Sequence, residues 1–314
     1  MQCVRFTVRN FFVPLLHILA YSLGHAVLLS KYFLIIRQAA AMGDSGLKLS
    51  ILMPVFNEEK TVAEILERVL SSSANAHEII VVDDGSTDRT AEIVARQCEK
   101  HSAIRLFRLE KNQGKTAAVR RAIQEAVGDI LIVQDADLEY DPNEIAEIIR
   151  PIQTGQADVV YGSRFMVRRA ARVLYFYHYL ANKFLTLLSN VLTNRNMSDI
   201  ETCYKAFRAG VIKPLKITSR RFGMEVEITA MVCKTKARTY EVPISYYGRT
   251  YDEGKKIGLR DGFAAIYYIL FYNLIKPWTR KGRQYVREVN EFLDQLREEG
   301  DQSVEMTNDE WLKK

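Results

Sequence analysis

Acidic side chains gather directly after an apolar run in the segment VQDADLEYDP. Asp135 and Asp137 are two residues apart, so their side chains point the same way in an extended segment, and Glu139 continues the row. Carboxylate oxygens suit Mg²⁺ or Mn²⁺, which complete their coordination with waters and phosphate oxygens. A helix-entry cap is the alternative, because acidic residues favour helix N-termini and Asp141 precedes a proline. The cap accounts for Asp141 but not for Asp135 and Asp137.

A second acidic turn, VVDDGSTD, follows another apolar run. Gly85 allows a tight turn after Asp83 and Asp84. A carboxylate at the carboxyl end of a strand can accept hydrogen bonds from a ribose, as in dinucleotide-binding folds. An ordinary strand–turn–helix connection capped by Ser86 explains the same letters, so this turn alone leaves both interpretations open.

The elements that must position these side chains alternate, from Leu47 onward, between strand-like apolar runs and amphipathic helices. Short runs such as EIIVV and DILIV predict strands that are buried on both faces. The alternation predicts an α/β fold, with a mostly parallel sheet and helices on both of its faces. In such folds ligands bind at the carboxyl ends of the strands, where the acidic turns lie.

The second half of the chain is less regular. It predicts an aromatic-rich helix over 165–195, a helix over 223–234, a strand in TYEVPISYY and a very apolar helix over 258–278. The charged stretch after Lys281 predicts a helix with a solvated face or a frayed terminus.

The bulk composition fits a globular chain that buries a core, with 314 residues, 48% hydrophobic and 26% charged. The formal charge of +6 suits an anionic ligand or a membrane surface. We expect no nucleic-acid partner, because this charge is modest and no helix-turn-helix, zinc-finger or aromatic RNA-binding motif accompanies it. The four cysteines show no CxxC spacing, which argues against a metal cluster or disulfide framework and favours a reducing compartment.

The first 46 residues differ in character from the rest. Residues 11–30 carry no Asp, Glu, Lys or Arg, and a run of about 20 apolar residues can span a bilayer. Pro14, His17 and His25 weaken that interpretation, and no small-residue cleavage site ends the run. Three interpretations stay open: a membrane anchor, an interfacial helix, and an extension upstream of a true start at Met42.

Four segments resemble, in order and spacing, those of family 2 glycosyltransferases: ILMPVFNEEKTV, VVDDGSTDRT, NQGKTAAVRRAI and VQDADLEYDP. The resemblance covers residues 48–260 and is strongest to the subgroup of dolichyl-phosphate mannose synthases and bacterial polyprenyl-phosphate sugar transferases. A fifth segment, GRTYDEGKK, resembles a motif of the mannose synthases. The resemblance implies the nucleotide-sugar-binding GT-A fold, with a transferase domain over 47–257. C-terminal helices would follow over 258–314, part of them at a membrane interface.

The resemblance also implies roles on the donor side of the site. The residues that would hold the base are Pro54, Phe56 and Glu58, with Asp84 on the base or ribose. Gln134 and Asp135 would line the nucleotide-sugar site, and the metal ligands would be Asp135, Asp137 and Glu139. Phe56 and Glu139 depart from the family, which often has Tyr and Gln at these positions.

For the phosphates, the resemblance assigns Arg249 and Lys255 to the donor diphosphate and Arg164 to the phosphate of the acceptor. Arginine suits this role because its guanidinium binds phosphate oxygens through two parallel hydrogen bonds. A second basic residue is expected on the helix that follows Arg164. The candidates for it are His178, Arg168, Arg169 and Arg172.

These assignments predict an enzyme, a hexosyltransferase that moves one mannose- or glucose-type sugar, with inversion, from a GDP- or UDP-sugar to a polyprenyl or dolichyl phosphate. Cations would stabilise the charge that develops on the leaving diphosphate. A lipid monophosphate is mostly dianionic at neutral pH, so it needs cationic guides more than a general base. The expected location is the cytoplasmic face of a membrane, with peripheral binding or an N-terminal anchor.

Two alternatives stay open. The first is transfer to a saccharide or other hydroxyl acceptor, for which Asp199 or Glu201 would act as general base unless it is a structural carboxylate that binds backbone amides. The second is a nucleotide-sugar-binding scaffold without catalysis, against which the full set of acidic and basic residues argues.

Overall fold

The computed structural model describes residues 46–166, 173, 175–220, 223–248 and 259–312. The chain divides into two units, Met1–Gly46 and Leu47–Lys314. Only Gly46 of the first unit is described, so the predictions for residues 1–45 lie outside the described residues.

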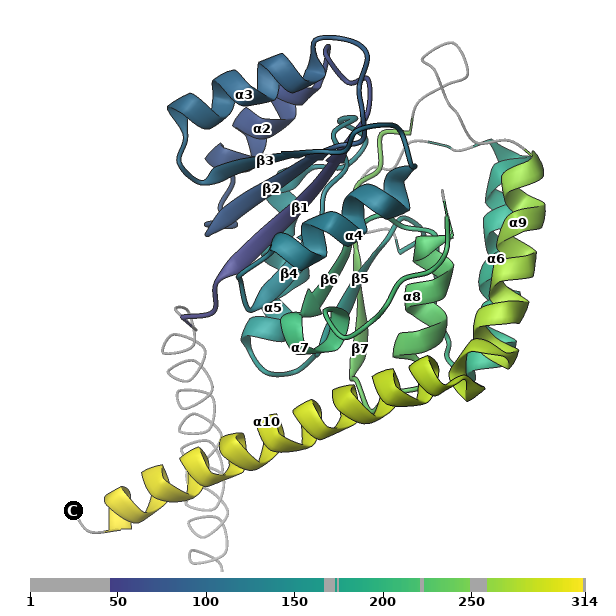
Figure 1. Cartoon of the computed structure of the whole chain (residues 1–314). Helices are drawn as coiled ribbons and strands as arrows, with labels where there is room; N and C mark the ends of the chain where they lie inside the picture. The colour runs from purple at the N-terminus through teal and green to yellow at the C-terminus, as the bar shows by residue number, and fades with distance from the viewer. Residues whose placement is uncertain (1–45, 167–172, 174, 221–222, 249–258, 313–314) are drawn as a thin grey trace, which may run out of the picture. The chain divides into compact units, whose positions relative to one another are not determined.

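A seven-stranded sheet forms the centre of the second unit, in the order β3-β2-β1-β4-β6-β5-β7 (Figure 1). Its strands are β1 (Leu49–Val55), β2 (Glu78–Asp83), β3 (Ile104–Arg108), β4 (Ile130–Val133), β5 (Val159–Ser163), β6 (Lys205–Arg208) and β7 (Thr239–Pro243). Neighbouring strands pair in parallel except at β6, which runs antiparallel to β4 and β5. The predicted mostly parallel sheet is therefore confirmed.

The helices are α2 (Val62–Ser71), α3 (Thr90–Lys100), α4 (Lys115–Glu125), α5 (Ile145–Gln153), α6 (Phe176–Thr193), α7 (Ala209–Ile212), α8 (Met224–Val232), α9 (Leu259–Leu274) and α10 (Arg280–Leu312), with 3₁₀ turns η1 (Pro142–Glu144) and η2 (Lys276–Trp278). Right-handed crossovers place α2 and α3 on one face of the sheet and α4 on the other, because the β3–β4 connection runs back past β1. Figure 1 shows α4 crossing in front of the sheet. Within the described ranges, no helix combines the length and the apolarity that a membrane crossing requires.

The core lies along the middle strands. Every residue of β1, β2, β4 and β5 is buried, as the runs EIIVV and DILIV predicted for strands covered on both faces. The chain reverses its direction along the sheet at β1, which lies between β2 and β4. A crevice opens outside the carboxyl ends of the strands at such a switch point. The turns that follow β2 and β4, at Asp84 and Asp135, lie at this edge.

Three elements differ from the sequence-based predictions. The aromatic helix α6 begins at Phe176 and not near residue 165, because Phe165 belongs to a turn. The short antiparallel strand β6 was not predicted. The first half of α10 has the predicted solvated face, but it also has a buried stripe of Tyr285, Val289 and Leu293, which was not predicted. Their spacing of four residues places them on one face, which packs against the domain.

Candidate active site

The acidic loop, Gln134–Asp141, begins where β4 ends. Its first residue, Gln134, is buried, and the side-chain Nε2 of Gln134 donates to the backbone carbonyl of Asp135 at 2.9 Å. The backbone of Leu138 adopts the left-handed region, with φ of 62°, which is unfavourable for a branched side chain. Strain of this kind persists where surrounding contacts impose it, and it clusters at ligand sites. At the end of the loop Asp141 caps η1 by accepting from the Asn143 amide at 3.0 Å, as the cap interpretation predicted for that residue.

Lys115 lies between two carboxylates at this edge. Its Nζ atom is 3.0 Å from each carboxylate oxygen of Asp135 and 3.4 Å from Oε1 of Glu225. The lysine comes from the first turn of α4 and the glutamate from the first turn of α8. Burial acts to lower the pKa of Lys115, but the neighbouring groups, with Asp135 first and Glu225 among them, together raise this pKa well above its ordinary value.

The donor atoms of the acidic loop fit a hard divalent cation, since the side chains of Asp135 and Asp137 offer carboxylate oxygens. The ammonium group of Lys115 rests on Asp135, so this position accepts positive charge. Among the described residues no three His, Cys, Asp or Glu side chains gather closely enough to hold a metal ion by themselves. Mg²⁺ keeps waters and substrate phosphate oxygens in its coordination, so one or two carboxylates suffice for it.

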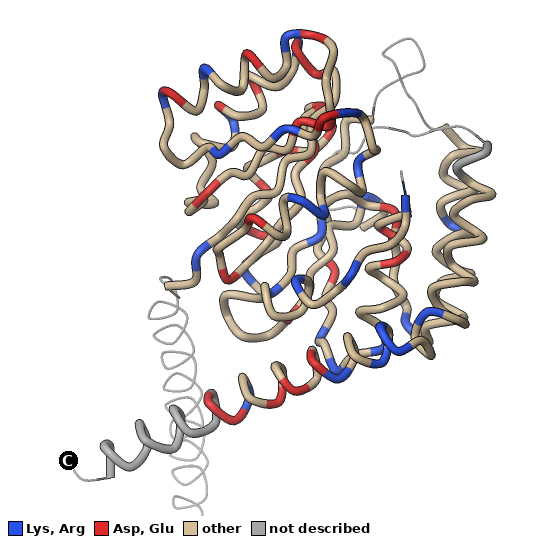
Figure 2. The backbone as a smooth tube through the Cα atoms, viewed as in Figure 1, with Lys and Arg blue, Asp and Glu red and all other residues tan. Residues whose placement is uncertain are grey.

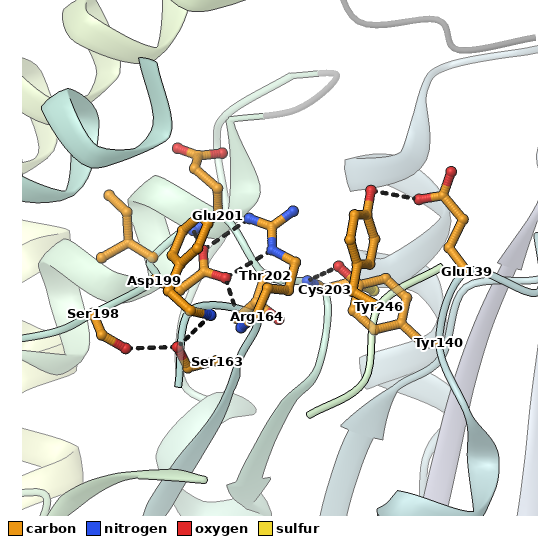
Figure 3. A network of polar contacts seen from close by, with 12 residues as sticks. Glu139, Tyr140, Ser163, Arg164, Ser198, Asp199, Glu201, Thr202, Cys203 and Tyr246 are labelled. Atoms are coloured by element: carbon orange, nitrogen blue, oxygen red, sulfur yellow. Dashed lines mark hydrogen bonds and ion pairs between the residues drawn. The ribbon is translucent and has the colours of Figure 1, made fainter. Parts of the chain in front are cut away.

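Tyr246, in the segment after β7, links the acidic loop to the other half of the site. Its hydroxyl donates to Oε2 of Glu139 at 2.8 Å, and the Tyr247 amide donates to the Glu139 carbonyl at 2.9 Å. The Tyr246 ring lies 5.3 Å from the Tyr140 ring, and the Arg164 guanidinium lies 5.2 Å from the Tyr246 centroid. Figure 3 shows Tyr246 hydrogen-bonded to Glu139 in this network.

Arg164 follows β5 and is held by Asp199 (Figure 3). Its Nε and Nη2 atoms donate to the two carboxylate oxygens at 2.7 and 2.8 Å. Asp199 also accepts from the backbone amides of Arg164 and Glu201, each at 3.2 Å. Burial acts to raise the pKa of Asp199, but Arg164 lowers it below its ordinary value. A carboxylate held charged in this way is the structural carboxylate that the alternative interpretation described.

Glu201 has a different environment from Asp199. Its Oε1 atom is buried without a hydrogen-bond partner among the described residues. Burial, reinforced by the charge of Glu225, raises the pKa of Glu201 from 4.5 to about 7. In Figure 3 the Glu201 carboxylate points away from Asp199. A carboxyl group that titrates near neutral pH is suited to proton transfer.

The predicted nucleotide side is built around the turn after β2. Asp84 accepts from the backbone amides of Gln113 and Gly114 at 2.8 and 2.7 Å, and burial raises its pKa. Gly85 has a φ of 72°, and a Cβ atom there would lie 2.8 Å from the backbone of Lys111, so only glycine fits this predicted tight turn.

Residues from the end of β1 and the following segment complete that side. Pro54 lies buried within β1, whereas Phe56 and Glu58 are half-buried beyond it. The Glu58 amide donates to Thr90 at 2.9 Å, which ties this segment to α3. The roles of these residues and of Asp84 towards a nucleotide stay predictions.

The structure thus brings together Glu139 and Arg164, which meet at Tyr246, and joins Asp135 to Lys115. Five other predicted residues lie outside the described residues, namely Arg249, Lys255, Arg168, Arg169 and Arg172. His178 lies in the first turn of α6, with its ring 5.9 Å from that of Tyr175.

Sequence reasoning assigned no role to Lys115, Glu225 or Tyr246. Lys115 belongs to one of the four family-like segments, NQGKTAAVRRAI. That membership was the one sequence signal that could have assigned Lys115 to the site. Glu225 and Tyr246 reach the site only through long-range packing.

Helices α6 and α9 pack side by side and expose an apolar surface, the α6–α9 face (Figure 1). Its exposed side chains are Phe176, Leu180, Phe184, Leu187 and Val191 on α6, and Phe263, Tyr267, Leu270 and Leu274 on α9. The buried side of α6 carries Leu185 together with Thr186, Ser189 and Thr193. The helix therefore has apolar side chains towards solvent as well as towards the core, unlike the usual arrangement, in which the opposite face is polar.

Basic residues cluster where α10 begins, next to the end of α9, and are coloured blue in Figure 2. Arg280, Lys281 and Arg283 are exposed there, next to Trp278, which is 73% exposed. Neither residues 176–193 nor residues 262–275 contain an Asp or Glu. The surface is thus apolar and aromatic with a positive border.

A model of the family "Glycosyl transferase family 2" matches residues 50–215. The dolichol-phosphate mannosyltransferase of Pyrococcus furiosus is 29% identical over 215 residues, which cover 68% of this chain and 60% of that protein. The undecaprenyl-phosphate 4-deoxy-4-formamido-L-arabinose transferase of Photorhabdus laumondii is 30% identical over 215 residues, covering 66% of this chain and 62% of that protein. The chain thus matches less than two thirds of the length of these relatives.

Among solved structures, glucosyl-3-phosphoglycerate synthase from Mycobacterium tuberculosis is similar in fold. Its complex with Mn²⁺, uridine diphosphate and phosphoglyceric acid aligns with a TM-score of 0.58 at 19% identity, covering 74% of this chain and 83% of that one. Its complex with Mn²⁺ and uridine-diphosphate-glucose aligns with a TM-score of 0.57 at 18% identity, over 74% and 82% of the two chains. The likeness confirms the predicted GT-A fold.

Proposed function

Because the chain belongs to glycosyl transferase family 2, we propose that it moves a single mannose- or glucose-type sugar, with inversion, from a GDP- or UDP-sugar to a polyprenyl phosphate. Two relatives are named for transfer involving dolichol phosphate and undecaprenyl phosphate, which supports this class of acceptor. A solved structure of similar fold was obtained with Mn²⁺ and uridine-diphosphate-glucose, which supports a nucleotide-sugar donor and a divalent cation.

The observation that carries this proposal is the position of Tyr246. One ring contacts both the acidic loop, through Glu139 at 2.8 Å, and the guanidinium of Arg164 at 5.2 Å. The proposed site for a cation-bound diphosphate and the proposed site for an anionic acceptor would therefore be separated by about one side chain. That spacing suits transfer of one sugar between two phosphate groups.

Asp135, Asp137 and Glu139 would hold Mg²⁺ or Mn²⁺, and this ion would neutralise the charge that develops on the leaving diphosphate. Arg164 would receive the phosphate of the acceptor. Because Asp199 already fixes two nitrogens of its guanidinium, little side-chain freedom is lost when a phosphate binds. The acceptor phosphate is largely dianionic at neutral pH and attacks the sugar carbon without a base. Arg249 and Lys255 are proposed to bind the diphosphate.

The α6–α9 face supports an acceptor that lies in a membrane. Aromatic side chains at a lipid–water boundary and basic side chains beside anionic headgroups are both favourable. Lipid would cover the exposed apolar stripe, and the border of Arg280, Lys281 and Arg283 would face the headgroups. We therefore propose peripheral binding at the cytoplasmic face of a membrane, with the N-terminal run of residues 11–30 as a possible additional anchor.

Transfer to a saccharide or other hydroxyl acceptor is the second candidate, and Glu201 is the observation that favours it. A hydroxyl needs a base, and the pKa of Glu201, raised by burial to about 7, suits that task at neutral pH. Asp199 does not suit it, because Arg164 holds it charged and occupied.

A donor screen with lipid vesicles tests the proposal. The purified chain is incubated with labelled GDP-mannose or UDP-glucose and vesicles that contain a polyprenyl phosphate, with Mn²⁺ or with EDTA. Acid-labile, alkali-stable label in the lipid fraction that disappears with EDTA is the expected result. Label found only in a saccharide product would support the hydroxyl acceptor instead. Transfer from neither donor to any acceptor would contradict both candidates.

A further inference from the structure

The carboxylate of Glu225 has one buried oxygen that accepts no hydrogen bond from the described residues. The residue is 4% exposed in the first turn of α8. Its Oε1 atom lies 3.4 Å from Nζ of Lys115, whereas its Oε2 atom is buried without a hydrogen-bond partner among the described residues. A buried carboxylate oxygen without a partner is costly, and such atoms in a folded protein call for an explanation.

The position of Glu225 supplies the explanation. Lys115 contacts both Asp135 and Oε1 of Glu225, so one ammonium group separates the Glu225 carboxylate, which carries the unpartnered Oε2, from the carboxylate proposed to bind the donor's metal ion. In a nucleotide sugar the diphosphate joins the transferred sugar on one side to the ribose on the other. The ribose or base is assigned to Asp84, so the sugar is the group that remains for Glu225. A pyranose presents several hydroxyl donors, and a charged carboxylate oxygen is a strong acceptor for them.

The neighbouring acidic residue of the same helix behaves differently. Both carboxylate oxygens of Glu227 accept hydrogen bonds from Thr218, and Oε1 also pairs with Lys276 at 3.3 Å. Glu227 thus fixes the preceding segment and the start of η2, and its oxygens are fully used. Glu227 is therefore a structural carboxylate, whereas Glu225 keeps one oxygen available to a ligand.

We propose that Glu225 recognises the transferred sugar, with Oε2 accepting a hydrogen bond from a sugar hydroxyl while Lys115 holds Oε1 in place. This inference rests on the proposed function, since it requires a nucleotide-sugar donor at Asp135. It makes Glu225 a residue that selects for the sugar and not for the nucleotide. Glu225→Gln keeps the size of the side chain but weakens the acceptor, so it should reduce recognition of the sugar alone.

Calorimetric titrations with two matched pairs of ligands test this, GDP against GDP-mannose and UDP against UDP-glucose, all with Mn²⁺. For the pair that the wild-type chain binds, Glu225→Gln should weaken nucleotide-sugar binding about 10- to 100-fold, as expected for loss of a hydrogen bond to a charged group. Binding of the free nucleotide should change less than about threefold. Glu227→Gln is the matched control, and it should leave the ratio of nucleotide-sugar affinity to free-nucleotide affinity unchanged. Thermal melting of each variant shows whether it is folded at the titration temperature, and Glu225→Asp serves if Glu225→Gln is not.

Three outcomes would overturn the inference. An unchanged ratio in folded Glu225 variants would leave Glu225 with a structural role only. Loss of Mn²⁺ binding in Glu225→Gln, measured by electron paramagnetic resonance without nucleotide, would make Glu225 a metal ligand. Wild-type protein that binds none of the four nucleotides would contradict the proposed function itself, whereas normal wild-type binding with an unchanged ratio would contradict this inference alone.

Discussion

Neutralising one buried carboxyl group should change how stability depends on pH. Burial raises the pKa of Glu201 from 4.5 to about 7, so the folded chain binds this proton more tightly than the unfolded chain does. The stabilisation is complete below pH 4.5 and is lost as the pH rises through 7. A change of this size corresponds to at most about 3 kcal/mol of the free energy of unfolding. Glu201→Gln has no proton to lose, so the variant should gain that amount relative to the wild type between pH 4.5 and 8.

Urea denaturation followed by circular dichroism at several pH values between 4.5 and 8 measures the effect. The difference in unfolding free energy, variant minus wild type, should rise with pH and level off above pH 7. Glu298→Gln is the control, because Glu298 lies exposed on α10 and its difference should stay flat. Parallel curves for the wild type and Glu201→Gln would refute the argument that burial controls this carboxyl group.

The same variant separates the two candidate functions. If the acceptor is a lipid phosphate, Glu201→Gln should keep turnover within about tenfold, because no base is needed. If the acceptor is a hydroxyl, turnover should fall about 100-fold or more, since general base catalysis contributes that much. Initial rates with each acceptor class at pH 7.5 provide the comparison.

Three further substitutions test other parts of the site and its surface. Asp137→Asn should reduce turnover at least about 100-fold with an unchanged melting temperature, because it removes a metal charge and little volume; retention of most activity with Mg²⁺ or Mn²⁺ would contradict the metal assignment. Arg164→Ala should cost about 3–5 kcal/mol of stability by leaving Asp199 buried and unpaired, and in titrations below its melting temperature it should weaken acceptor binding more than donor binding. Equal losses for both ligands would contradict its role. Leu187→Asp should reduce sedimentation with anionic vesicles at least about fivefold, as an exposed charge opposes burial in lipid, whereas Val127→Asp, outside the α6–α9 face, should not.

The first half of the fold was predictable because its signals are local. Apolar runs such as EIIVV mark strands that are covered on both faces, and the acidic turns that follow them reach the edge of the sheet wherever the strands are parallel. Asp135 and Asp84 could therefore be assigned to one crevice without any knowledge of tertiary contacts. The left-handed backbone at Gly85 was equally visible, because only glycine adopts it without strain.

The remaining features depend on contacts between distant segments. Only Phe207 of the four residues in β6 favours a strand, and β6 forms because it pairs with β4 and β5. Glu225 meets Lys115 across 110 positions of sequence, and no spacing rule connects them. The buried stripe of α10 was missed for a similar reason. Tyr285 and Val289 occupy only one position in four, in a segment whose other residues are mostly charged.

The exposed apolar side chains of α6 affect both solubility in water and the proposed binding to a membrane. Replacing Leu180, Phe184 or Leu187 by charged side chains would make the free chain more soluble and less prone to self-association. If the acceptor is a lipid phosphate, the same changes would also remove the affinity that keeps the enzyme near a substrate confined to two dimensions. Selection for a well-behaved purified protein and selection for turnover on lipid would therefore move these positions in opposite directions.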